Sequence, residues 1–257
     1  NKILGRVLKA LSQEVNINLV EINGGSKNNA IPIEALVTIA IDKEDEGKVS
    51  EIISYWNEKI KKELRVQDPD LNIKIVDGAV RSSEMFTTKY TEKTIDLLYL
   101  YPNGINTKSV EIEGLIESST NIGVVSTKDN YVQFDSAVRS SVPSLKEEIV
   151  TRTKNIVELL GGEMITTSDY PAWQYNPDSK LREICQEVHK KMYGKEAEIV
   201  AIHAGVECGL FNEILGDLDM ISFGPDLFDV HTPDEHMSIK SVKNTWEYLL
   251  EILKAIK

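Results

Sequence analysis

Apolar residues recur along the first part of the chain with two different periods. Residues 2–15 carry Ile, Leu and Val at helical spacing, which predicts an amphipathic helix. Residues 35–41 carry Ala, Val, Ile and Ile at every second position, the period of a strand. A strand at 17–22, a helix over 49–64 and a strand at 72–76 complete the block. The predicted order is therefore helix, strand, strand, helix, strand.

A second block repeats this order with little residue identity. Its predicted elements are a helix near 88–100, strands at 121–127 and 131–139, a helix opened by a Ser144–Glu147 capping box, and a strand at 163–167. We therefore predict two tandem α+β sandwich repeats of ferredoxin-like type, about 1–80 and 85–169. Each would be an antiparallel sheet with helices on one face, and the two sheets are either separate or joined into one.

The pattern changes at Tyr170–Pro177, where two prolines and three aromatic side chains predict a packed linker. Beyond it, helices alternate with strands at 198–202 and 219–223, which predicts α/β architecture with a parallel sheet. A parallel sheet is buried on both faces, so two strands are too few. The chain also starts at Asn1 within a helical pattern and without Met. We therefore expect residues 1–169 to be an insertion in a larger α/β domain.

Composition narrows the class of protein. The chain has 257 residues, a net charge of −12 and 41% apolar residues, which fits one or two domains with a core. The acidic charge argues against nucleic acid or an anionic membrane as the partner. No run approaches the length of a transmembrane helix, and no signal peptide is recognisable. Two cysteines indicate a reducing, cytoplasmic location.

Two loops that follow the predicted parallel strands carry side chains suited to chemistry. Residues 202–209 include His203, Gly205 and Glu207, and residues 229–236 include two histidines and three carboxylates. Carboxyl ends of parallel strands meet at one edge of a sheet, where ligands bind. Plainer readings stay open: a solvent-facing polar loop, or a helix that begins with an acidic residue. A Cys208/His203 nucleophilic pair is a further alternative, although cysteine is often simply buried.

Two polar residues in the first 169 residues are candidate substrate contacts. Arg139 ends a predicted strand on its polar face, and a guanidinium there could bind a carboxylate through two hydrogen bonds. Asn29 stands in Asn-Ala-Ile-Pro, before a rigid turn. The alternatives are a surface arginine and an ordinary turn residue. His231 is one plausible metal ligand, but a catalytic zinc requires three or four protein ligands.

Several motifs together resemble one family of enzymes. Residues 202–211 (Ile-His-Ala-Gly-Val-Glu-Cys-Gly-Leu-Phe), 223–225 (Phe-Gly-Pro) and 231–235 (His-Thr-Pro-Asp-Glu) resemble the catalytic segment of aminoacyl-histidine dipeptidases. These enzymes, also called Xaa-His dipeptidases, peptidase D or bacterial carnosinase, belong to the carnosinase-like di-zinc metallopeptidases. Further segments resemble the family in the same order: residues 1–6, 24–32, 102–104, 121–125, 138–140 and 170–174.

The resemblance implies a domain for each part of the chain. Residues 1–169 would form a lid or dimerisation-type domain, and residues 170–257 the C-terminal segment of the α/β catalytic domain. The family's other zinc ligands and its catalytic base would lie upstream of Asn1. The complete enzyme would hold two zinc ions, whereas this chain would bind zinc weakly or not at all and would be inactive alone.

The resemblance also implies roles for individual residues. The implied roles are a zinc ligand (His231), a residue that supports this ligand (Glu235), substrate contacts from the lid (Arg139, Asn29) and residues that line the substrate pocket (His203, Gly205, Glu207). The implied reaction is hydrolysis of Xaa-His dipeptides by a zinc-activated water, with a homodimer as a possible assembly. A non-catalytic module for small-ligand binding or dimerisation is the alternative.

Overall fold

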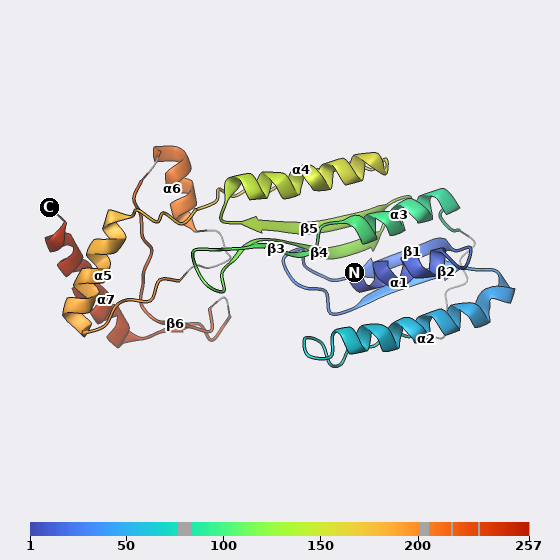
Figure 1. Cartoon of the computed structure of the whole chain (residues 1–257), viewed down its shortest axis with the longest axis horizontal. Coiled ribbons are helices and arrows are strands. Elements are labelled where there is room, and N and C mark those ends of the chain that lie inside the picture. Colours follow the sequence, from blue (N-terminus) through green and yellow to red (C-terminus); the bar gives the residue numbers. More distant parts are fainter. Residues whose placement is uncertain (77–83, 201–205, 217, 231, 257) are drawn as a thin grey trace. The chain divides into compact units, whose positions relative to one another are not determined.

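The computed structural model describes residues 1–76, 84–200, 206–216, 218–230 and 232–256. The chain divides into two compact units (Figure 1). Unit 1 comprises Asn1–Lys108, Ser118–Arg139 and Ser144–Thr166, and unit 2 comprises Ser109–Glu117, Ser140–Pro143 and Thr167–Lys257. Among the described residues, no helix is long and apolar enough to cross a bilayer.

Unit 1 is built on a sheet of five strands, which are β1 (Asn18–Gly24), β2 (Ala35–Ala40), β3 (Gly104–Lys108), β4 (Ile116–Thr127) and β5 (Val132–Ser140). Their order is β2-β1-β4-β3, and β5 also pairs with β4. β1 is antiparallel both to β2 and, through Asn23↔Ser126 and Gly24↔Val125, to β4. The two predicted repeats therefore share one sheet, since β1 and β2 come from the first and the other strands from the second.

The helices of unit 1 are α1 (Lys2–Ser12), α2 (Glu46–Glu63), α3 (Thr88–Leu100) and α4 (Pro143–Leu159), with a short 3-10 turn, η1 (Lys43–Asp45), before α2. α1 and α3 pack closely, because a Cβ on Gly5 would lie only 2.8 Å from Leu98 Cβ. The predicted capping box at Ser144 is wrong: α4 begins one residue earlier, at Pro143. Proline suits the first helical position, because its fixed φ is already helical and no N–H is needed there.

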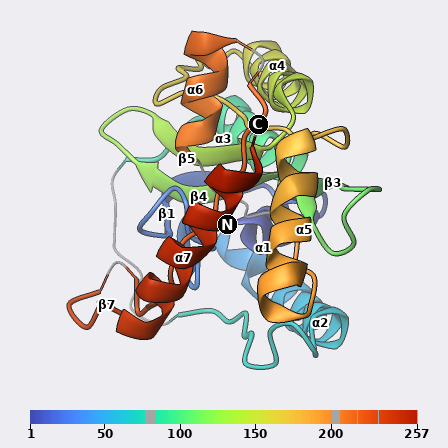
Figure 2. The ribbon, with the colours of Figure 1, turned by 90° about the vertical axis from the view of Figure 1, so that its left-hand side faces the viewer.

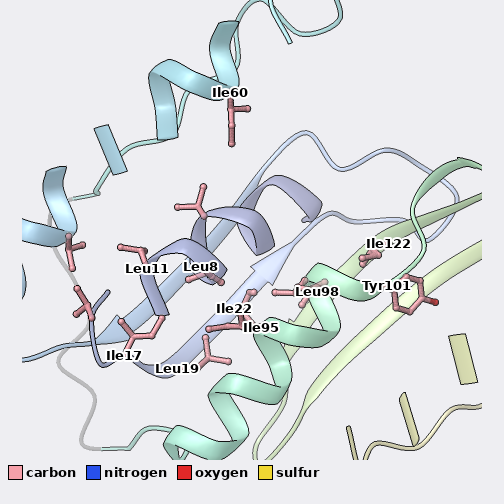
Figure 3. Close-up of a cluster of buried hydrophobic side chains, with 14 residues drawn as sticks. Leu8, Leu11, Ile17, Leu19, Ile22, Ile60, Ile95, Leu98, Tyr101 and Ile122 are labelled. Atoms are coloured by element: carbon pink, nitrogen blue, oxygen red, sulfur yellow. The ribbon is translucent and has the colours of Figure 1, made fainter. Parts of the chain in front are cut away.

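The core of unit 1 lies between the sheet and α1, α2 and α3 (Figure 3). Its largest members have less than 2% of their surface exposed: Leu8, Leu19, Ile22, Ile60, Leu98 and Ile122. Full burial of one such side chain contributes about 1.5–3 kcal/mol. Leu8 and Ile60 lie on the faces that the helical patterns of residues 2–15 and 49–64 assign to the core. Leu19 and Ile22 do not share the strand period, and the register of β1 shifts between Leu19 and Glu21.

Unit 2 contains α5 (Lys180–Tyr193), α6 (Glu207–Leu215), α7 (Ile239–Ala255) and a two-stranded hairpin, β6 (Leu227–Phe228) with β7 (His236–Met237). α5 and α7 lie side by side (Figures 1 and 2), around Cys185, Tyr248 and Ile252. The Tyr248 hydroxyl donates to the Cys185 carbonyl at 2.8 Å. This hydrogen bond joins the two helices.

Several predicted strands do not form among the described residues. Segments 72–76, 163–167, 198–200 and 219–223 belong to no ladder, and the strand β3 was not predicted. A strand forms only when another pairs with it. Several apolar side chains in these segments stay accessible, for example Ile165 at 85% and Val200 at 67%. Segments 198–200 and 219–223 of unit 2 are therefore not strands among the described residues, because no neighbouring strand pairs with either segment.

Candidate functional site

The connection between β1 and β2, which we call the Asn29 loop (residues 25–34), presents Asn29 to solvent. Gly25 N–H donates to the Glu34 carbonyl at 3.1 Å and closes the base of the loop. Ala30 N–H donates to the Lys27 carbonyl at 3.2 Å, so Asn29 is the third residue of a β-turn. Gly25 has φ +78°, a conformation that glycine adopts without strain. The turn-rich sequence thus exposes one amide at a defined position.

The Asn29 loop rests directly on β4. A Cβ on Gly123 would lie 2.3 Å from the Asn28 carbonyl oxygen, and one on Gly25 would lie 1.9 Å from the Gly123 carbonyl oxygen. Beside this contact, Asn121 Nδ2 donates to the Ala30 carbonyl at 2.7 Å. Glycine permits such a close approach of two backbones. The loop is therefore fixed on the strand by both packing and hydrogen bonding.

Arg139 lies near the end of β5, half-buried, opposite the neighbouring part of β4. On one side of it, Ser136 Oγ is 3.4 Å from Thr120 Oγ1. On the other side, Ser141 N–H donates to the Glu117 carbonyl at 3.1 Å. Arg139 therefore lies on β5 beside the part of β4 that contains Thr120, while the Asn29 loop covers residues 121–123. One strand thus supports the two substrate contacts that were predicted for unit 1.

Unit 2 places Glu207 at the first residue of α6, after Val206 as N-cap. A carboxylate in this first turn interacts favourably with the helix dipole, as the plainer reading expected. A Cβ on Gly209 would lie 2.4 Å from the Pro171 carbonyl oxygen, so this glycine permits a close backbone contact. Burial, and then the nearby Glu207 charge, raise the pKa of the Cys208 thiol. The raised pKa argues against Cys208 as a nucleophile, because the thiolate is the reactive form.

Residues 232–235 of the His-Thr-Pro-Asp-Glu motif lie in the turn of the β6–β7 hairpin. Thr232 N–H and Oγ1 both donate to the Asp229 carbonyl, at 3.2 Å and 2.6 Å, and Asp229 has φ +51°. Glu235 is exposed, and its N–H donates to the Thr232 carbonyl at 3.2 Å. His236 stacks on Phe228, with 5.1 Å between the ring centroids. His231, His203 and Gly205 lie outside the described residues.

Within the described ranges, no three or more His, Cys, Asp or Glu side chains lie together in a way that could hold a metal ion. A zinc site needs three or four protein ligands. The described residues therefore do not form a metal site by themselves, and any zinc would need ligands in addition to them.

Comparison with known proteins decides the relationship. Over its full length the chain is 33% identical to the cytosol non-specific dipeptidase of Escherichia coli (strain K12) and covers 53% of that protein. Its structure matches the crystal structure of aminoacylhistidine dipeptidase from Vibrio alginolyticus with a TM-score of 0.90 and 35% identity, over 100% of this chain and 52% of that one. The chain is homologous to these dipeptidases. The resemblance read from the motifs is confirmed.

Two further matches refine this relationship. Residues 1–68 of the chain match the family described as a peptidase dimerisation domain. The aminopeptidase PepT structure from Bacillus cereus ATCC 10987 matches 99% of the chain and 91% of its own, with a TM-score of 0.52 and 12% identity, which shows the fold alone. The predicted fold class, α+β repeats followed by an α/β segment, is confirmed as a mixed α/β fold with antiparallel sheets. The chain spans about half the length of the dipeptidases that it matches.

Sequence reasoning missed the residues that hold the Asn29 loop. Asn121 and Gly123 stand in a segment that resembles the family, and Asn1 begins the chain, but the sequence predicted no role for any of them. Asn1 Nδ2 donates to the Ile122 carbonyl at 3.0 Å and to the Gly24 carbonyl at 3.3 Å. The one available signal was Gly123 itself, because a glycine inside a strand often marks a close backbone approach.

Proposed function

We propose that this chain is the part of a dipeptidase that binds the free carboxylate and the carbonyl of an Xaa-His dipeptide. One observation carries the proposal. In a chain homologous over its whole length to two dipeptidases, Asn29 and Arg139 lie beside adjacent parts of β4. The guanidinium of Arg139 would bind the carboxylate through paired hydrogen bonds, and the Asn29 amide would hold the carbonyl. The two contacts would limit substrates to short peptides with a free C-terminus.

Residues 170–257 would contribute to the catalytic domain of the same enzyme. His231 would supply one zinc ligand, Glu235 would support it, and His203, Gly205 and Glu207 would line the substrate pocket. The remaining ligands and the catalytic base would come from residues that this chain does not contain. Bound zinc would supply an activated water for hydrolysis in the complete enzyme. We therefore expect the 257-residue chain to be inactive alone and to bind zinc weakly.

Exposed apolar side chains in unit 2 support a larger catalytic domain. Trp246 is 59% exposed, Leu253 is 58% exposed and Ile214 is 74% exposed. Monomeric proteins rarely leave large apolar surfaces uncovered. Additional strands that pair with 198–200 and 219–223 would cover such surfaces and would complete the predicted parallel sheet. A cytoplasmic location fits this proposal, as the name of the Escherichia coli relative suggests for that protein.

A dimerisation role is the second candidate. Residues 1–68 match a peptidase dimerisation domain, and β2 is the terminal strand in the order β2-β1-β4-β3. An edge strand offers unpaired backbone groups to another chain. Sedimentation of the intact protein would test for a homodimer. A dimer that neither hydrolyses nor binds a dipeptide would favour this candidate over the enzymatic one.

The decisive experiment compares dipeptides that carry a free or an amidated C-terminus. We expect Arg139→Ala in the intact protein to lower kcat/KM for an Xaa-His dipeptide about 10- to 100-fold, the usual range for a charged hydrogen bond. For the amidated substrate, kcat/KM should be the same in this variant as in the unmodified protein, because that substrate lacks the carboxylate. Arg152→Ala is the control, since Arg152 on α4 bonds Asn106 and Glu148 and should change the rate little. An unchanged preference for the free acid in Arg139→Ala would refute the proposed role.

A further inference from the structure

One side chain outside the predicted site holds the Asn29 loop on both sides of Asn29. Asn121 Nδ2 donates to the Ala30 carbonyl at 2.7 Å and to the Asn28 carbonyl at 3.4 Å. These two carbonyls belong to the residues directly before and after Asn29. We propose that Asn121 is a positioning residue that fixes Asn29 for dipeptide binding. This inference rests on the proposed function of Asn29.

The packing beneath the loop explains why one amide can do this. Asn28 lies against Gly123, where a Cβ would approach its backbone atoms to 2.3–2.5 Å. This van der Waals contact limits how closely the loop approaches β4, but such a contact is not directional and does not fix the position of the loop along the strand. Hydrogen bonds are directional and do fix it. The two donors of the Asn121 amide therefore determine where along β4 the turn that carries Asn29 sits.

The base of the loop is held independently of Asn121. Asn1 Nδ2 binds the Gly24 and Ile122 carbonyls, and Gly25 N–H binds the Glu34 carbonyl. Removal of the Asn121 amide therefore frees the apex of the loop and leaves its ends in place. The sheet should keep its register, because β1 still pairs with β2 and with β4.

The test uses the intact protein with Asn121→Ala and Asn121→Asp. The aspartate has the size of asparagine but offers no donor to the two carbonyls. We expect kcat/KM for an Xaa-His dipeptide to fall about tenfold in each variant, as the loss of hydrogen bonds of ordinary strength predicts. A misplaced contact residue lowers the rate even when it is still present.

A double-mutant cycle separates positioning from general structural damage. If Asn121 acts through Asn29, the change Asn121→Ala should cost little further rate once Asn29 is alanine. Additive losses in kcat/KM would overturn the proposal. Asn103→Ala is the matched control, because its Oδ1 accepts from Ile122 N–H of the same strand at 3.0 Å. This hydrogen bond is made to β4 and not to the loop, so its loss should leave kcat/KM within about twofold. An equal loss in this control would also overturn the proposal.

Hydrogen exchange keeps this inference distinct from the proposed function. Amides at the apex of the loop, residues 28–30, should exchange faster in Asn121→Ala than in the unmodified protein, with no substrate present. Unchanged exchange in the loop would overturn the positioning role whatever the kinetics. Failure of the unmodified protein to hydrolyse or bind any dipeptide would instead refute the proposed function, and exchange in the loop would then decide alone whether Asn121 holds Asn29.

Discussion

The contact between α1 and α3 predicts opposite effects for two glycine-to-alanine substitutions. Gly5 lies in α1, where a new Cβ would sit 2.8 Å from Leu98 Cβ and 3.2 Å from the Leu98 backbone carbonyl carbon. Gly47 lies in α2, and a Cβ there would meet nothing within 4 Å. Neither glycine has a positive φ, so alanine suits both backbone conformations. The two substitutions therefore differ mainly in packing.

The magnitude follows from two opposing effects. Alanine favours a helix over glycine by about 1 kcal/mol, and to first order this gain is common to both sites. At Gly5 the new methyl group falls well inside the optimal carbon–carbon separation of about 3.5–4.0 Å. Since Leu98 is fully buried, the helices must move apart, and overpacking of this kind costs about 1–3 kcal/mol. We therefore expect Gly5→Ala to be about 1–3 kcal/mol less stable than Gly47→Ala.

Urea denaturation of the two variants measures this difference. Trp56 on α2 packs against the core of unit 1, so its fluorescence reports on that unit when Trp173 and Trp246 are replaced by phenylalanine. The slope m should agree between the variants, which shows that the same surface is exposed on unfolding. If Gly5→Ala proved as stable as Gly47→Ala, the close contact of α1 with α3 would be refuted.

Three further predictions test the core and the helix ends. Leu98→Ala should cost about 2–5 kcal/mol of unfolding free energy, whereas Leu100→Ala, 54% exposed, should cost less than about 0.5 kcal/mol, both by urea denaturation. Ser179→Ala removes the acceptor for Arg182 N–H at 3.0 Å and should cost unit 2 about 1 kcal/mol, measured by circular dichroism of thermal unfolding. Burial by itself raises the pKa of Asp219, but hydrogen bonds from Ser179 and from the Leu181 and Lys180 amides hold this pKa below its usual value. The stability that the Asp219 carboxylate contributes should therefore be present above about pH 4 and lost as the pH falls through its folded pKa. The Asp219→Asn variant should accordingly be less stable than the unmodified protein above about pH 4, and this difference in stability should disappear in acid.

The sequence predicted best those elements whose buried face can be assigned from the pattern of their own residues. The helix expected over 2–15 is α1 (Lys2–Ser12), and the strand expected at 35–41 is β2 (Ala35–Ala40). In both, periodicity assigns the buried face, and burial drives the packing. Segments 163–167 and 198–200 also belong to predicted strands, yet they form no strand among the described residues. A strand depends on a neighbour that the local sequence does not specify.

The candidate site shows the same limit at the level of single residues. Asn29 and Arg139 could be named from sequence because their side chains suit a carboxylate or a carbonyl. Asn121 could not, because its function comes from where its partners lie: the Asn28 carbonyl is 93 residues away in the chain. Gly123 signalled that a backbone approaches β4, but not which one. Only the pairing of β1 with β4 brings the Asn29 loop onto that glycine, so a long-range register selects the residue that positions the local motif.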